Sequence, residues 1–278
     1  MPTSRLPKRT SNPQTADPPS TWLRALLLFA VFTVLAVVLL LLPASLLRRF
    51  LPPNVTAGEF SGTIWHGSAA DLSVDRRSFG AIEWRLHPGS LLGLSVNADL
   101  HWVKVGFVAD GRLQIDSHGF TVRNAEGGGP LEDLHDLGIA RAWVGETRFT
   151  LGVLQVRLPQ DMNGHFNVLA VTGDLDLDNV SSAQLAAGTN LGGYVLHLAD
   201  PSLAPRADIT AELTDTGGPL ALHAAIRLTA DGHTGMLSGT VQARDDASPA
   251  LRREVDTLAE LHARDAAGNI PVDLEFTL

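Results

Sequence analysis

The densest group of possible metal ligands in this sequence is His118, Asp133, His135 and Asp136. Imidazoles and carboxylates bind a metal ion when the fold brings several of them together. The ten histidines of the chain form no His-Glu-x-x-His pattern, and there is no cysteine. Polarity of a loop beside a short helix explains the group more simply, so we predict no metal site there.

A second acidic group is formed by Asp174, Asp176 and Asp178, which alternate with Leu175 and Leu177. Three carboxylates on one face of a strand could attract calcium, but the run lacks the glycine and the spacing of a calcium-binding loop. Alternation of this kind is typical of a strand with one solvated face and one apolar face. We therefore interpret the three aspartates as a solvated face.

Signals for nucleophilic or phosphate chemistry are also missing from the sequence. The glycines at 127–129 are not followed by Gly-Lys-Ser/Thr, and no Gly-x-Ser-x-Gly is present. A hydrolase would need Ser, His and Asp assembled by the fold alone. We predict that the chain is not an enzyme, with no catalytic residue and no cofactor.

Composition narrows the classes of partner. The net charge is −9 at pH 7, and the first residues of the chain are basic, so the remainder is more acidic still. A nucleic-acid partner is therefore not expected, because nothing in the sequence suggests a basic surface for a phosphate backbone.

A long apolar segment near the N-terminus is a candidate membrane anchor for the residues that follow it. Residues 25–42 are apolar apart from Thr33, and 18 residues at about 1.5 Å each span about 27 Å, close to the hydrocarbon thickness. A buried helix would carry a polar stripe, and a cleaved signal peptide would have a shorter apolar run with a better cleavage site. The sequence favours an uncleaved transmembrane helix.

Charge and proline content divide the chain outside this apolar segment into three regions. Residues 1–24 form a basic tail that we predict to be disordered. The positive-inside rule places this tail in the cytoplasm, although Arg48 and Arg49 oppose that orientation. Residues 43–57 form a proline-rich exit segment, and residues 58–278 form a large domain outside the cytoplasm.

The large domain shows period-two alternation, which is typical of half-buried antiparallel strands. The predicted fold is mainly β, with an elongated, twisted antiparallel sheet and one or two short helices. The alternating segments are residues 71–75, 94–102, 112–116, 153–158, 173–178, 208–213, 220–228, 237–243 and 272–278.

Two helices are predicted within this β pattern. Residues 248–262 begin with Ser248 as an N-cap and Pro249 at the first helical position. The apolar face that follows consists of Leu251, Val255, Leu258 and His262. Residues 130–137 carry acidic side chains in the first turn, where they favour a second, shorter helix.

The most distinctive segment is residues 62–92, in which Trp65 and Trp84 each lie on an alternating stretch. Packing of the first two strands explains both tryptophans, and a protein contact is the alternative. Pro88 and the pair Leu91 and Leu92 predict a turn followed by an apolar corner tucked against the domain.

These residues carry a resemblance to protein N of the bacterial type II secretion system. The local pattern is Gly-Thr-φ-Trp-x-Gly-x-Ala at residues 62–69, then Trp-x-Leu-x-Pro at residues 84–88. The similarity covers roughly residues 51–278, and is weaker at residues 191–194, 218–220 and 243–278. The residues that carry the motif are Gly62, Trp65, Gly67, Trp84, Pro88, Leu91 and Leu92.

The resemblance implies a non-enzymatic, single-span accessory subunit of the inner membrane with a periplasmic domain. It implies contacts with inner-membrane platform subunits and with the outer-membrane secretin. Exposed sheet edges would suit such contacts. An alternative is an envelope lipid-handling protein with an apolar β-groove, and a third is an anchored hydrolase.

Overall fold

The structure is a computed structural model that describes residues 20–137, 142–157, 167–185, 188–199, 208–229 and 234–277. The chain divides into two compact units, Met1–Leu42 and Pro43–Leu278. The first unit contains α1 (Ser20–Leu40), a helix of 21 residues. Within the ranges described, no helix qualifies by length and apolarity as a membrane span. The span predicted over residues 25–42 therefore stays a prediction.

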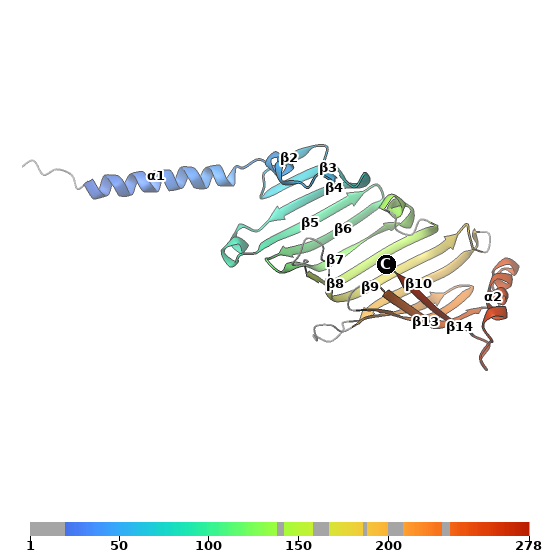
Figure 1. Cartoon of the computed structure of the whole chain (residues 1–278). Helices are drawn as coiled ribbons and strands as arrows, with labels where there is room; N and C mark the ends of the chain where they lie inside the picture. The colour runs from blue at the N-terminus through green and yellow to red at the C-terminus, as the bar shows by residue number, and fades with distance from the viewer. Residues whose placement is uncertain are drawn as a thin grey trace, which may run out of the picture. The chain divides into compact units, whose positions relative to one another are not determined.

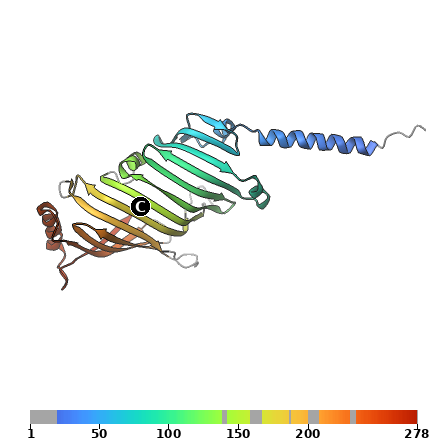
Figure 2. The ribbon, with the colours of Figure 1, turned by 180° about the vertical axis from the view of Figure 1, so that it is seen from behind.

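The second unit is built on one antiparallel sheet of 14 strands, drawn from both sides in Figures 1 and 2. Each strand from β3 onward pairs with the next strand in the chain, while β1 and β2 both pair with β3. The strands are β1 (Val55–Thr56), β2 (Phe60–Gly62), β3 (His66–Val74), β4 (Arg77–Leu86), β5 (Val96–Lys104), β6 (Phe107–Ile115), β7 (Gly119–Pro130), β8 (Trp143–Arg157), β9 (Asn167–Ser182), β10 (Asn190–Ala199), β11 (Ile209–Gly217), β12 (Leu220–Leu228), β13 (Thr234–Ala243) and β14 (Ile270–Thr277).

The predicted fold class is confirmed as mainly β and antiparallel, with a few short helices. Each alternating segment of the sequence falls mostly within a strand, although Leu158 and Leu278 lie outside the described residues. Strand β7 was not predicted from the sequence, and its end carries the three glycines at 127–129. Those glycines belong to the ladder, where Gly127 pairs with Ala109 and with Phe149.

Four short helices accompany the sheet in the described part of this unit. The predicted helix at residues 248–262 is α2 (Pro249–Leu261), and the Oγ of its N-cap Ser248 accepts a hydrogen bond from Leu251 N at 3.2 Å. The helix predicted at residues 130–137 is η3 (Leu131–Leu137), which is a 3₁₀ helix. The others are η1 (Ala44–Phe50) and η2 (Pro88–Gly93).

The two faces of the sheet differ in chemistry because every strand alternates and the register aligns like with like. Trp84 pairs with Leu100, which pairs with Gly111, while Glu83 pairs with His101 on the other side. We call the first side the apolar face. Its side chains include Ile82, Trp84, Leu86, Ala98, Leu100, Trp102, Leu113, Val122, Phe149, Leu175, Leu177, Leu196, Leu213, Leu222 and Ile226.

The opposite side, the polar face, carries ion pairs between neighbouring strands. His101 Nδ1 lies 2.7 Å from Asp110, His197 Nδ1 lies 2.5 Å from Asp174, and Arg112 Nε lies 3.1 Å from Asp99. Asp174 therefore faces solvent beside a histidine, as the solvated-face interpretation requires. These exposed pairs stabilise the ladder only weakly.

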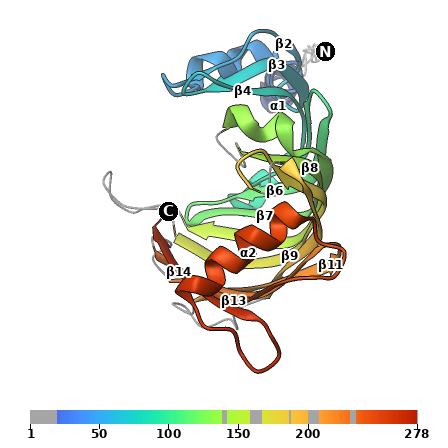
Figure 3. The ribbon, with the colours of Figure 1, turned by 90° about the vertical axis from the view of Figure 1, so that its right-hand side faces the viewer.

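The sheet curves around η3 and α2, which both lie on the side of the apolar face (Figure 3). Although β5, β6 and β7 separate β4 from β8, η3 contacts both of those strands. The Arg77 guanidinium of β4 donates to the Leu137 carbonyl at 2.9 Å, which holds η3 against that strand. Register shifts within several strand pairs are bulges, which bend a sheet in this way.

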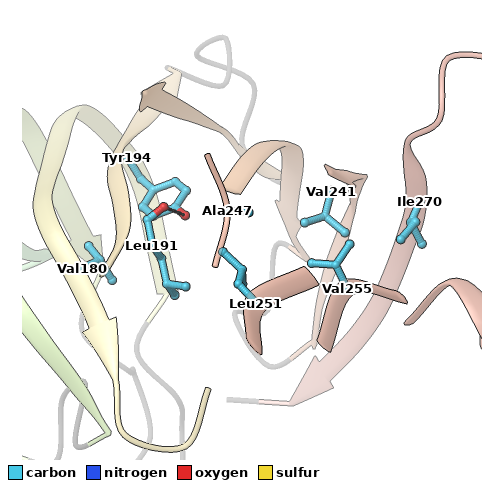
Figure 4. Close-up of a cluster of buried hydrophobic side chains, with 8 residues drawn as sticks. All are labelled: Val180, Leu191, Tyr194, Val241, Ala247, Leu251, Val255 and Ile270. Atoms are coloured by element: carbon cyan, nitrogen blue, oxygen red, sulfur yellow. Dashed lines mark hydrogen bonds between the residues drawn. The ribbon is translucent and has the colours of Figure 1, made fainter. Parts of the chain in front are cut away.

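A cluster of buried apolar side chains lies at the C-terminal end of the sheet, where α2 covers the apolar face (Figure 4). Leu251 and Val255 of α2 are buried against Val241 and Ile270, which pair across β13 and β14. The predicted apolar face of the helix is thus correct for those two positions. Leu258, which follows them, is exposed.

An ion pair between Arg244 and Asp215 lies beside this core. Arg244 Nη2 donates to Asp215 Oδ1 at 2.5 Å, and Leu222 N donates to Asp215 Oδ2 at 3.1 Å. Burial acts to raise the pKa of Asp215, but these hydrogen bonds outweigh it and hold that pKa below its usual range. Burial also raises the pKa of the nearby Tyr194 hydroxyl to about 12.

The Asp215 carboxylate makes stability depend on pH. Its pKa is lower in the folded chain than in the unfolded chain, so its contribution is complete above about pH 4 and is lost as the pH falls through the folded value. We expect Asp215→Asn to lower the free energy of unfolding at pH 7 by about 1–2 kcal/mol and to flatten the loss below pH 4. Urea unfolding of the full chain, followed by tryptophan fluorescence, measures both effects.

Asp273→Asn provides the control, because Asp273 is exposed on β14. If Asp215→Asn and the parent lose stability equally between pH 7 and pH 3, the carboxylate has no such role.

Candidate functional site

The residues that carry the family pattern lie at the N-terminal end of the sheet, around β2, β3 and β4. Trp84 Nε1 donates to the Ile64 carbonyl at 2.8 Å, which ties β4 to the turn between β2 and β3. The Trp84 ring also meets Phe60 edge to face, with 6.3 Å between centroids. Trp84 is half-buried on the apolar face, so its part in this corner is to pack.

Two glycines of the pattern are required by this packing. A Cβ at Gly67 would lie 2.7 Å from the carbonyl oxygens of Ser61 and Thr63 and 2.8 Å from the Trp84 ring. Gly62 has a φ of +80°, and a Cβ there would lie 2.4 Å from the His66 carbonyl. The spacing Gly-x-x-x-x-Gly therefore lets a tight turn form beneath the Trp84 ring.

Trp65 occupies a different position from the one its sequence context suggested. It lies in the bend between β2 and β3 rather than on a strand, and it is half-buried. Its carbonyl accepts a hydrogen bond from Leu86 N at 2.7 Å, so the bend is joined to the end of β4.

The remaining residues of the pattern form an exposed apolar tip. Pro88 begins η2, which connects β4 to β5 and has no buried residue. Leu91 and Leu92 are 45% and 93% exposed, so the prediction of a tucked corner is wrong. The short helix ends at Leu94, whose left-handed backbone (φ 55°) turns the chain into β5 and leaves that side chain exposed too. We call Leu91, Leu92 and Leu94 the η2 tip.

Lys104, at the end of β5, is a notable residue that was not predicted from the sequence. Lys104 pairs with Phe107 on the apolar face and is only 4% exposed. The signal was present, because alternation continued from Leu100 and Trp102 places residue 104 on the same side of the strand. A lysine in that register is unusual, since charged side chains are seldom buried without a partner.

The four residues weighed as metal ligands are not brought together. His135 Nε2 lies 2.7 Å from the Trp143 carbonyl, and Asp133 accepts from Gly106 N at 2.9 Å. Asp136 faces Lys104, whereas His118 lies in the turn beside Asp116. In the ranges that could be searched, no three His, Asp or Glu side chains are grouped to hold a metal ion.

The shifted carboxylates are held by structural contacts. The Arg112 hydrogen bond holds the pKa of Asp99 below its usual range. The Asn269 side chain and backbone do the same for Asp265 in the turn before β14. Each carboxylate is stabilised in its ionised form, which suits an ion pair or a turn rather than proton transfer at neutral pH.

Together these features define a class of protein: an antiparallel meander with one apolar face, a packed tryptophan corner and an exposed apolar tip. Its sequence matches the family described as type II secretion system (T2SS), protein N, over residues 53–273. Because that match covers well over half of its length, this chain belongs to the family.

Membership of the family indicates a role in type II secretion and a place in the cell envelope. The family is an accessory component of the secretion machinery and is not known as an enzyme. Comparison with curated proteins gives no match, and comparison with solved structures gives none either.

The tryptophan corner can be tested through its glycine. We expect Gly67→Ala to force the Ser61 and Thr63 carbonyls and the Trp84 ring apart, at a cost of about 1–3 kcal/mol in the free energy of unfolding. Urea unfolding of the full chain measures it. Gly89→Ala is the control, because nothing lies within 4 Å of a Cβ at Gly89. Equal stability of the two variants would show that the corner tolerates a side chain.

Proposed function

We propose that the chain is a non-enzymatic, bitopic inner-membrane accessory subunit of the type II secretion system that contacts other secretion subunits. The observation that carries this proposal is the η2 tip, since it lies within the family match and exposes Leu91 and Leu92. Exposed leucines grouped on one short helix suit a contact with a partner. The tryptophan corner behind them then has the task of holding the tip rigid.

The partners in this proposal are the inner-membrane platform subunits, and also the outer-membrane secretin. Gly62, Gly67 and Trp84 serve the contact indirectly, by packing, whereas Pro88, Leu91 and Leu92 serve it directly. Pro88 at the first position of η2 fixes the backbone where the tip begins.

In this proposal residues 25–42 anchor the chain in the inner membrane, with residues 1–24 in the cytoplasm and residues 58–278 in the periplasm after the exit segment 43–57. The support is the uncharged run itself, together with the exposure of apolar side chains such as Phe29 and Phe32 along α1. An anchor would keep the domain near other membrane subunits and raise its effective concentration there.

Handling of envelope lipids is a second candidate function, and the apolar face favours it. That face continues along the sheet, while η3 and α2 cover only parts of it. An apolar surface of this kind suits an acyl chain, which forms no hydrogen bonds of its own.

The proposed topology can be tested because the chain has no native cysteine. Ser4→Cys and Ser117→Cys place single thiols before the anchor and in the exposed turn after β6. In intact cells with a permeabilised outer membrane, a membrane-impermeant maleimide should label Cys at position 117 and not at position 4. Labelling of position 4 alone would show the opposite orientation. Equal labelling of both positions would contradict the proposal that residues 25–42 cross the membrane.

The contact role predicts that the η2 tip can be crosslinked to secretion subunits. A benzophenone maleimide on Leu92→Cys should capture a platform subunit or the secretin in cells, identified by mass spectrometry. Val105→Cys is the matched control, because Val105 is 87% exposed at the opposite end of β5. Crosslinks of equal yield from both positions, or none from Leu92, would contradict the proposal.

The same tip should matter for secretion while leaving stability unchanged. We expect Leu91→Ser with Leu92→Ser to reduce secretion of a type II substrate several-fold in a strain where deletion of the gene reduces it. The unfolding transition should stay within about 0.5 kcal/mol of the parent, because both side chains are exposed. Normal secretion in the double variant would exclude the tip as the contact.

A further inference from the structure

The Lys104 ammonium has too few acceptors for a buried cation. Nζ has no hydrogen-bond partner in the structure, and the Asp136 carboxylate that faces it lies 3.8 Å away. That separation exceeds hydrogen-bonding distance, and Asp136 is 74% exposed, so its charge is largely screened by water. An ammonium carries three donor N–H groups, and burying them unpaired is costly.

Aromatic side chains neighbour Lys104 on the apolar face. Trp102 and Phe107 lie beside it on the apolar face with 5.1 Å between ring centroids, and Phe107 stacks on Phe149 at 6.2 Å. The Trp102 indole N–H is already used, since it donates to the Phe79 carbonyl. A ligand at this place would meet one cation and a row of aromatic rings.

The apolar face is exposed at the end of β5 that lies farthest from Lys104, although Ala98 on the way is buried. Its strand β5 runs to Val96, and the neighbouring β6 runs to Ile115, and both of those side chains are exposed. The eight steps from Lys104 to Val96, at about 3.3 Å each, make a path of about 26 Å from the lysine to that open end. The backbone groups along the path are occupied by the ladders of β4, β5 and β6.

We propose that the apolar face holds the acyl chain of an anionic lipid and that Lys104 receives the negatively charged headgroup. An extended peptide fits this place poorly, because its own N–H and C=O groups would find no partners on an apolar surface. The headgroup of an anionic lipid supplies the hydrogen-bond acceptor that the Lys104 ammonium lacks. Its acyl chain needs no hydrogen-bond partner. This inference rests on the second candidate function and names its ligand class.

The test uses the full chain in lipid nanodiscs that contain a phospholipid with a photoreactive acyl chain. One preparation carries an anionic phosphatidylglycerol probe, and the other carries a zwitterionic phosphatidylcholine probe. We expect the anionic probe to label peptides with Leu100, Trp102 or Phe149 several-fold more than the zwitterionic probe does. Labelling of α1 reports equal incorporation of the two probes.

Two variants separate a headgroup site from a structural ion pair. Lys104→Gln should reduce labelling of the apolar face by the anionic probe about tenfold. Asp136→Asn should maintain or increase it, since that variant removes the competing carboxylate. Unfolding transitions confirm that each variant is folded.

Three results would overturn the inference: equal labelling by both probes, labelling unaffected by Lys104→Gln, or labelling confined to α1. A loss of labelling in Asp136→Asn equal to that in Lys104→Gln would also overturn it, because it would assign Lys104 to its ion pair. Crosslinks from Leu92→Cys to secretion subunits should persist in the Lys104→Gln background, so the contact role is tested independently.

Discussion

The whole structure depends on antiparallel pairing between strands that are neighbours in the chain. Because consecutive strands pair with each other, the register of one pair fixes which side chains the next strand places on each face. Leucine, tryptophan and phenylalanine then accumulate on one side, and aspartate, histidine and arginine on the other. A shift of one residue in any strand would reverse that separation, so alternation in the sequence and pairing in the sheet specify each other.

The family pattern makes sense as a device for starting this ladder. The edge at β1 and β2 is formed by strands of two and three residues, which pair with β3 one after the other. Gly67 lets the turn between β2 and β3 pass beneath Trp84, and Trp84 binds the turn back to β4. The corner therefore fixes the first full-length strands and, beyond β4, the helix that bears Leu91 and Leu92.

Much of the fold could be predicted because alternation and capping are local signals. Ser248 and Pro249 located α2, and the alternating leucines and aspartates of β9 located both of its faces. Strand β7 was missed because glycine has little preference for strands, and only its neighbours β6 and β8 hold residues 127–129 in the ladder. Burial of Lys104 and exposure of Leu92 depend on η3 and on the turn after β4, which no local pattern describes.

A sheet in which consecutive strands pair has a consequence for how the chain acquires its structure. Most strand pairs join strands that are consecutive in the chain. Little chain entropy is therefore lost when each pair forms. Each strand can be added to those already formed, beginning at the tryptophan corner. The docking of η3 on β4, and of α2 on a core that includes Val180 and Tyr194, must wait for partners that are distant in the sequence. Among the described strands the ladder ends at β14, so the outer side of β14 is open to pairing with another strand.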